Sequence, residues 1–275
     1  MGTVKAAVML AATSSIALAQ LPSGTAVPVT VDNYNRAQSD VYFGLTVKTG
    51  AFGKFLHRRE LVPVDRRGII RPNRDTLYSL AVFDLDAGPV TVTLPDAGKR
   101  FMVMQVVNED QYTPAVFYGA GRHTLTKERI GKRYGIVVVR MLVDPVRHPV
   151  GTALVWGGLP EKDALYLPVT PARNDGATIH KLTVKDVPVD GFWSITVYNA
   201  EGYLEPNQYN AYSVNNITAN RGADGSVAVQ FGGCDGEIPN CLPIMKDWNY
   251  TVRFFRPRPE ILDGTWRFPE AQPVS

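Results

Sequence analysis

The chain has 275 residues, of which 45% are hydrophobic and 20% are charged, and its formal net charge is +3. This balance is typical of a folded globular protein and excludes a largely disordered chain, which would have fewer apolar residues and a larger net charge. The basic residues form no long run and are not interleaved with aromatic residues, so no nucleic-acid partner is predicted.

Residues 1–19 have the pattern of a secretory signal peptide. Lys5 precedes a short apolar stretch, and Ala17-Leu18-Ala19 supplies the small residues of a cleavage site. We therefore predict cleavage after Ala19 and a periplasmic or secreted protein. The apolar stretch is shorter than the ~20 residues needed to span a bilayer, and no later segment reaches that length, so no transmembrane segment is expected.

Residues 20–60 are predicted to form an N-terminal helical segment. The spacing of apolar residues predicts an amphipathic helix over 31–48, and a second short helical piece is expected to run to Leu61. Gly50 and Gly53 separate the two. The apolar positions at helical spacing are Tyr34, Ala37, Val41, Tyr42 and Leu45.

Beyond residue 60 the pattern changes to the alternation typical of β-strands. Strands at roughly ten-residue spacing, with tight turns between them, favour a sandwich or barrel. We predict a first β domain over 61–143, a Pro/Gly-rich linker over 144–177 that packs on the surface, and a second β domain over 178–275. The expected strands lie at 79–85, 89–95, 100–107, 135–143, 178–184, 192–199, 209–217, 227–231 and 250–255.

The two cysteines, Cys234 and Cys241, flank a turn-like segment that contains Gly236 and Pro239. In an oxidising compartment such a pair is expected to form a disulfide. A zinc site would need further Cys or His residues at short spacing, so no metal is predicted.

Several segments resemble a known pair of bacterial domains. Residues 73–79, Asn-Arg-Asp-Thr-Leu-Tyr-Ser, are similar to the signature of domain of unknown function 1254. Residues 190–199, which begin Asp-Gly-Phe-Trp, resemble the opening of its usual partner, domain of unknown function 1214, as do 240–243 and 264–266. The resemblance covers about 31–269. It implies an all-β fold of two jelly-roll-like β-sandwich domains with a short N-terminal helical segment.

The chain departs from this family between its halves. In the family a longer helical segment separates the two domains, whereas here 143–145 lead almost directly to 156–158. A site that those helices cover would be more open here, or lost.

Standard catalytic signatures are absent from the sequence. It has no Gly-x-Ser-x-Gly elbow, no His-Glu-x-x-His helix and no phosphate-binding loop. A disulfide would also leave no thiolate nucleophile. No cofactor is predicted.

The densest polar cluster occupies 71–78, just before a predicted strand. Asp75 could act as a base, while Arg71, Asn73, Arg74 and Tyr78 could bind a substrate. The alternative is a structural hub in which Asp75 caps backbone amides and pairs with an arginine.

Two further places offer ionisable side chains. Glu109 and Tyr112 follow the strand at 100–107, and Glu109 or Asp110 could form a carboxylate pair with Asp75 or Glu60. His57 precedes Glu60 where the helical start gives way to sheet, so it is a candidate base, although a surface histidine is the commoner outcome. Catalytic candidates are therefore His57, Glu60, Asp75 and Glu109.

Aromatic residues of the second half could stack on sugar rings, although core packing is the commoner role. They are Trp193, Tyr198, Tyr203, Tyr209, Tyr212, Trp248 and Trp266.

Two functions follow as hypotheses. The first is a metal-independent hydrolase or lyase that acts on a small organic or carbohydrate substrate in a cleft between the domains. The second is a non-catalytic ligand-binding or envelope-associated jelly-roll protein, because such folds host both roles. The formation of an oligomer is left open.

Overall fold

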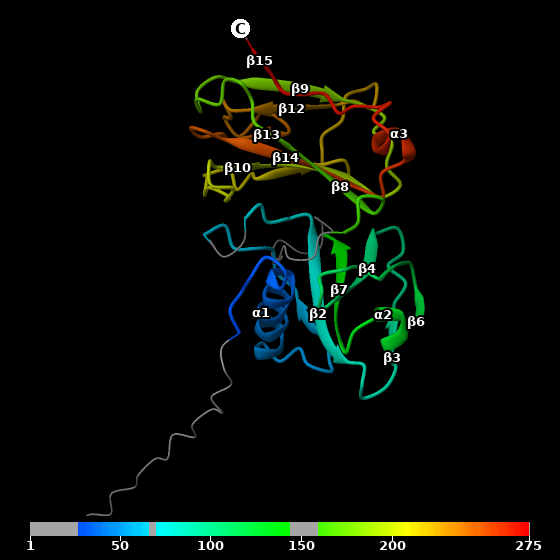
Figure 1. The fold of residues 1–275 in the computed structure, drawn as a ribbon. Coiled ribbons are helices and arrows are strands. Elements are labelled where there is room, and N and C mark those ends of the chain that lie inside the picture. The colour runs from blue at the N-terminus through cyan, green and yellow to red at the C-terminus, as the bar shows by residue number, and fades with distance from the viewer. Residues whose placement is uncertain (1–26, 66–69, 144–158, 275) are drawn as a thin grey trace, which may run out of the picture.

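The computed structural model describes residues 27–65, 70–143 and 159–274. The predicted signal peptide at 1–19 and the part of the predicted linker at 144–158 lie outside the described residues. The described chain is mostly β and forms several sheets, with strands that pair antiparallel almost throughout. Its N-terminal and C-terminal halves are stacked one on the other (Figure 1).

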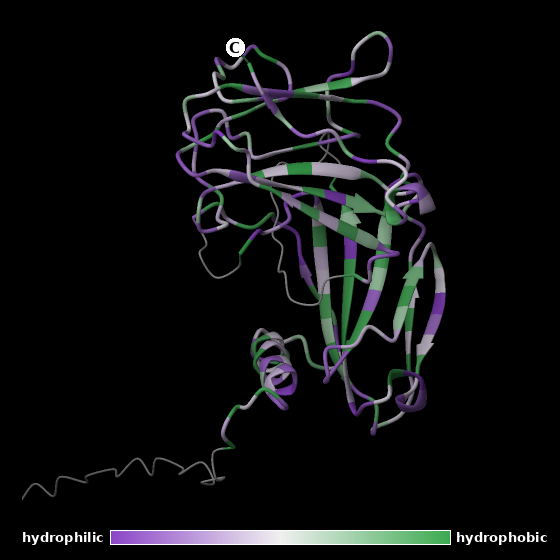
Figure 2. Cartoon of the chain, turned by 45° about the horizontal axis from the view of Figure 1, so that its top comes forward, coloured by the Kyte–Doolittle hydropathy of each residue, from purple (hydrophilic) through white to green (hydrophobic). Residues whose placement is uncertain are grey.

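The N-terminal half is built on a five-stranded antiparallel sheet in the order β1-β2-β7-β4-β5. Its strands are β1 (Leu56–Arg58), β2 (Thr76–Asp84), β4 (Met102–Asn108), β5 (Ala115–Tyr118) and β7 (Tyr134–Leu142). The central strands are largely hydrophobic (Figure 2), since both of their faces are covered.

Different elements cover the two faces of this sheet. On one face, the pair β3 (Val90–Leu94) and β6 (Gly121–Leu125), with helix α2 (Lys127–Ile130), encloses a core around Met104. On the other face, helix α1 (Tyr34–Lys48) packs Phe43 against the sheet.

Helix α1 is where the sequence predicts a helix, but it presents a different face to the sheet. It buries Ser39, Phe43 and Thr46. The expected apolar positions Val41 and Leu45 are 59% and 54% exposed. Thr46 can be buried because its hydroxyl donates to the Tyr42 carbonyl at 2.8 Å.

The predicted second helical piece before Leu61 is wrong. Residues Leu56–Arg58 form β1, which pairs antiparallel with β2 from Leu80 to Tyr78. Pairing with the neighbouring strand decides the conformation of so short a segment, whatever its local pattern.

The C-terminal half contains two four-stranded sheets that share one core. One sheet has the order β11-β10-β14-β8 and the other β13-β12-β9-β15. All pairs are antiparallel except β12 with β13. The elements are β8 (Ala164–Val169), β9 (His180–Val184), β10 (Trp193–Tyr198), β11 (Ser213–Asn215), β12 (Val227–Phe231), β13 (Cys241–Leu242), β14 (Asn249–Phe255), α3 (Pro259–Leu262) and β15 (Gln272–Pro273).

Strand β8 lies inside the range predicted as a linker. It pairs along its whole length with β14, so this segment is part of the C-terminal sheet rather than a surface connection. The prolines of 144–177 suggested irregular structure, yet Pro168 is accommodated opposite Thr251 on an outer strand.

Most of the second-half aromatic residues have the packing role. Trp193, Tyr198, Tyr212 and Trp248 are buried, and Trp266 packs against the shared core. The predicted disulfide is confirmed, since Cys234 and Cys241 are bonded with their Cα atoms 5.7 Å apart. None of the helices in the described ranges is both long and apolar enough to cross a bilayer.

Candidate functional site

One face of the sheet β11-β10-β14-β8 is polar and yet buried. Alternation along β10 sends Trp193, Ile195 and Val197 into the core, and Ser194 and Thr196 to the opposite face. Arg253 lies directly opposite Ser194 on β14, and Thr251 lies opposite Thr196. A polar sheet face normally meets water, but here it meets the N-terminal half.

The segment before β2 lies on this polar face. The Tyr198 hydroxyl donates to the carbonyl oxygen of Pro72 at 2.9 Å, and Arg253 donates to that of Arg71 at 3.1 Å. The backbone N–H of Arg71 donates to the Gly202 carbonyl at 2.7 Å. These bonds hold residues 71–75 between the two halves.

Asp75 is the carboxylate at this junction and is only 2% exposed. Its Oδ1 accepts hydrogen bonds from Asn215 Nδ2 at 3.2 Å and from Ser213 Oγ at 3.4 Å. Its Oδ2 has no hydrogen-bond partner among the described residues, and the same holds for Ser194 Oγ. Burial raises the pKa of Asp75, while the charge of Arg253 and the neighbouring Ser194 hydroxyl act in the opposite direction. The Ser194 hydroxyl is therefore near the carboxylate without forming a hydrogen bond of normal geometry to it.

Arg253 is the cation of the junction and is 2% exposed. Besides the Arg71 carbonyl, it donates to Thr196 Oγ1 at 2.9 Å and to the Tyr198 hydroxyl at 2.5 Å. These bonds use three of the five N–H donors of a guanidinium group, and no carboxylate of the described residues accepts from it. Burial alone would lower the pKa of Arg253, but Tyr198 and Asp75 outweigh it and the pKa is raised. Arg253 is therefore a buried cation.

A second arginine and two tyrosines extend the junction toward solvent. The Arg140 guanidinium donates to Gln105 Oε1 at 2.6 Å and lies 5.3 Å from the centre of the Tyr78 ring. Tyr166 is 39% exposed, but burial of its hydroxyl raises its pKa, against the charges of Arg140 and Arg253. Tyr166 therefore reaches from the surface to the arginines. We define Asp75, Ser194, Tyr198, Asn215 and Arg253 as the buried polar cluster.

Two family models match the chain. Protein of unknown function DUF1254 matches residues 52–144, and protein of unknown function DUF1214 matches residues 170–259. The chain belongs to the family that joins a DUF1254 domain to a DUF1214 domain. The buried polar cluster therefore takes Asp75 from the DUF1254 domain and its other four members from the DUF1214 domain.

Two solved structures share the fold. The VPA0106 protein from Vibrio parahaemolyticus is 14% identical with a TM-score of 0.65, over 88% of this chain and 97% of that protein. An uncharacterized protein from Burkholderia cenocepacia is 11% identical with a TM-score of 0.54, over 84% of this chain and 88% of that protein. A search of curated proteins finds no match.

The structure gathers five of the predicted site residues at the domain junction: Arg71, Asn73, Arg74, Asp75 and Tyr78. Asn73 accepts from the backbone N–H of Asp75 at 2.9 Å and donates to Thr76 Oγ1 at 3.0 Å. Arg74 donates to the Val62 carbonyl and lies 5.1 Å from the centre of the Tyr212 ring. Asn73 and Arg74 thus direct their polar groups to other parts of the protein, whereas the Asp75 side chain accepts from Asn215 and Ser213 and not, among the described residues, from a backbone amide or an arginine.

Glu109 and Tyr112 lie at the other end of the DUF1254 sheet. Thr76 pairs with Leu142 of β7, whereas Asn108 pairs with Gly135. Seven residues of β7 separate these positions, which at about 3.3 Å per residue is roughly 23 Å. Glu109 accepts from Arg36 at 2.5 Å and from the Tyr134 N–H at 2.9 Å, so it fastens α1 to the sheet.

His57 and Glu60 are not brought to the cluster either. His57 lies opposite Ser79, with 2.8 Å between His57 Nδ1 and Ser79 Oγ. Ser79 and Tyr78 are neighbours on β2 and point to opposite faces of the sheet, so His57 and Tyr78 lie on opposite faces. Glu60 and Tyr112 are exposed. Within the described ranges, no group of three His, Cys, Asp or Glu side chains is placed to bind a metal ion.

Sequence reasoning missed Arg253, Ser194 and Asn215. Ser194 and Thr196 alternate with apolar residues, which is also the pattern of a strand with one face in water. One signal was present in the sequence: Arg253 stands between Val252 and Phe254 in a predicted strand, where a buried charged side chain needs a specific partner.

Proposed function

We propose that the protein binds a small hydroxylated organic acid, such as a sugar acid, at the buried polar cluster. The ligand's carboxylate would accept from Arg253, and a ligand hydroxyl would donate to Asp75 Oδ2. Unused hydrogen-bonding groups of the cluster support this. Arg253 has N–H donors beyond the three hydrogen bonds that it makes, and Asp75 Oδ2 and Ser194 Oγ lack hydrogen-bond partners among the described residues.

Unpartnered polar atoms in the interior carry the proposal. A buried group without a hydrogen bond costs about 1–3 kcal/mol, so native proteins retain few of them. Here the carboxylate oxygen and the serine hydroxyl lie together at a domain boundary, and Thr251 Oγ1 on the same sheet face is also unpartnered in the described part of the chain. A ligand that completes their hydrogen bonds would account for their retention. Tyr166 is the exposed side chain whose rotation would give access.

A catalytic role is the second candidate, and the state of Asp75 favours it. A carboxyl group whose pKa is raised by burial is suited to general acid–base chemistry. In a lyase, Asp75 would remove the proton beside a carboxylate held by Arg253, and the electron pair would form a C=C bond as the hydroxyl on the next carbon leaves with a proton as water. In a hydrolase, Asp75 would take a proton from a water molecule as its oxygen attacks an ester carbonyl, and would return that proton to the departing alcohol. Both reactions, as written, use only side chains of the protein and need no metal ion.

We also propose that both halves are jelly-roll-like β-sandwich domains of an exported protein. The two sheets of the C-terminal half, which enclose one core, support the sandwich. The disulfide between Cys234 and Cys241 supports an oxidising compartment. We place the start of the second domain no later than Ala164, because β8 is part of its sheet.

The binding proposal is tested with Ser194→Ala and a matched control, Ser39→Ala. Both serines are buried with unpartnered hydroxyls among the described residues, but Ser39 lies on the buried face of α1, away from the cluster. Calorimetric titration and thermal melting would use D-gluconate, L-malate and L-lactate as probes, with D-glucose as the neutral comparison.

We expect at least one acid to raise the melting temperature, and this shift to fall only in Ser194→Ala. Without ligand, both variants should melt at or slightly above the wild-type temperature, because each loses a buried unpartnered hydroxyl. If no acid binds, or if both variants respond like wild type, the buried polar cluster is a structural hub. Turnover of a bound acid that disappears in Asp75→Asn would favour the lyase or hydrolase over simple binding.

A further inference from the structure

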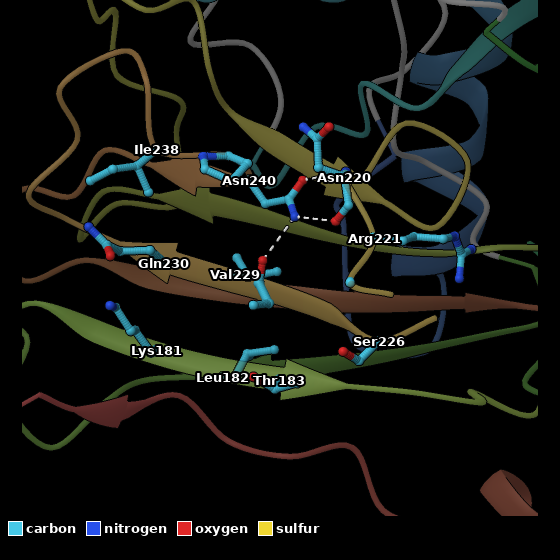
Figure 3. Close-up of a pocket in the computed structure, with 13 residues that line it drawn as sticks. Lys181, Leu182, Thr183, Asn220, Arg221, Ser226, Val229, Gln230, Ile238 and Asn240 are labelled. Atoms are coloured by element: carbon cyan, nitrogen blue, oxygen red, sulfur yellow. Dashed lines mark hydrogen bonds between the residues drawn. The ribbon is translucent and has the colours of Figure 1, made fainter. Parts of the chain in front are cut away.

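The outer face of the sheet β13-β12-β9-β15 carries a hollow, and a second hollow adjoins it beside the edge strand β13, where residues of β11 and the neighbouring loops line it. This sheet is the one farther from the DUF1254 domain (Figure 1). The hollows measure about 370 and 550 Å³, and they share Asn220, Ile238, Pro239 and Asn240 as a common wall. Figure 3 shows the first hollow, with β9 and β12 as its floor and Ile238 and Asn240 beside it.

Alternation along the two strands produces the floor of the first hollow. Leu182 and Val229 point into the core, so Lys181, Thr183, Ala228 and Gln230 point outward. Lys181 pairs with Gln230 and Thr183 with Ala228. The single methyl group of Ala228 leaves the space that the larger neighbours surround.

The common wall is fixed by its own hydrogen bonds. Asn240 Oδ1 accepts from the Asn220 N–H at 2.8 Å, while its Nδ2 donates to the carbonyls of Asn220 at 2.8 Å and Ala228 at 2.9 Å. The last bond ties the wall to β12 (Figure 3). The disulfide between Cys234 and Cys241 closes the loop that carries Asn240. The hollows are therefore preformed, which lowers the entropic cost of binding.

The first hollow holds polar groups with no hydrogen bond or ion pair to the described residues. They are Lys181 Nζ, Thr183 Oγ1 and the Asn220 side-chain amide, and Gln230 uses its Nε2 on two carbonyls while its Oε1 has no such bond. Two cations, Lys181 and Arg221, line this hollow and no carboxylate does. Across the wall, Tyr209 lines the second hollow, with its hydroxyl donating to the Cys234 carbonyl at 2.7 Å.

We propose that this surface binds a short oligosaccharide, with an acidic sugar over Lys181. Sugar hydroxyls both donate and accept, and side-chain amides offer both functions. A tyrosine ring offers a flat apolar surface to a sugar ring, and an ammonium group recognises a uronic-acid carboxylate. Two adjoining hollows with a shared wall offer room for more than one sugar of a chain. The site is separate from the buried polar cluster and does not depend on it.

The test is a calorimetric titration of the full mature chain with tri-galacturonate, and with maltotriose as the neutral probe. Ala228→Phe fills the first hollow from an exposed strand position, and Lys181→Gln removes its cation. Lys54→Gln is the charge-matched control, because Lys54 is exposed in the DUF1254 domain.

We expect tri-galacturonate to bind more tightly than maltotriose. Lys181→Gln should lower the affinity for tri-galacturonate about tenfold, because one charge-assisted hydrogen bond is lost, and should leave the affinity for maltotriose unchanged. Ala228→Phe should abolish binding of both, and Lys54→Gln should bind like wild type. Far-UV circular dichroism checks that each variant is folded. The proposal is overturned if tri-galacturonate does not bind wild type, or if Lys181→Gln binds it as wild type does.

Discussion

Replacing Asp75 with alanine tests whether the buried carboxylate holds the two domains together. The change removes the acceptor of Asn215 and Ser213 and a carboxylate whose charge acts on the buried Arg253. Removing one member of a buried charge pair costs about 3–5 kcal/mol. The hydrogen bonds from Asn215 and Ser213 are made to the same carboxylate, so their loss is counted within this cost and not added to it. Because burial also disfavours the charged form of Asp75, we expect the lower end, about 3 kcal/mol.

At roughly 2–4 °C per kcal/mol for a cooperative unit of about 250 residues, which the two coupled domains form together, Asp75→Ala should melt about 6–12 °C below wild type. Differential scanning calorimetry is the appropriate assay, because two domains that separate give two transitions where a coupled pair gives one. Asp32→Ala is the control, since Asp32 is exposed. If Asp75→Ala melts within about 2 °C of wild type, the carboxylate does not hold the interface and our account of the cluster is wrong.

Three further outcomes follow from the structure. Because the pKa of Asp75 is raised in the folded state, the stability that its protonated form contributes is fully present below about pH 4 and is lost as pH rises through the folded pKa. The asparagine that Asp75→Asn introduces does not titrate, so the melting temperature of this variant should rise relative to wild type between pH 4 and 8. A constant difference would contradict this. Glu109→Ala should lower the free energy of unfolding by about 1–3 kcal/mol, measured by urea titration, while ligand affinity at the distant cluster stays unchanged. Gly191→Ala should cost about 1–3 kcal/mol, because its Cβ would lie 2.5 Å from the Phe255 carbonyl oxygen, whereas Gly44→Ala in α1 meets no atom within 4 Å and should stabilise by about 0.5–1 kcal/mol.

The sequence predicts the β-strands well because their signal is local. Alternation and turn residues mark β3, β9, β12 and β14 close to their observed bounds. The face that α1 turns toward the sheet is not determined by local sequence. Its apolar residues fall on more than one side, and the sheet beneath selects the side with Phe43, leaving Val41 and Leu45 exposed. A pattern of spacing cannot tell which side a neighbouring sheet will cover.

The part of the candidate site that lies in the DUF1254 domain could be predicted, because its signal is also local. Residues 71–78 stand out because a dense polar run precedes an apolar strand, and the structure places that run at the domain junction. Glu109 is equally polar and equally close to a strand end, but it lies at the opposite end of the sheet's strands, which only the strand pairing reveals. Ser194 could not be predicted, because its burial comes from the other domain and not from its own strand.

The polar face of β10 and β14 also bears on how the chain is made. The N-terminal half leaves the ribosome first and must wait for Arg253 to be synthesised before the junction can close. Serine, threonine and arginine side chains are well solvated, so the later domain can present this face to water without inviting aggregation. The DUF1214 domain therefore does not need the junction to keep this face in contact with water during synthesis.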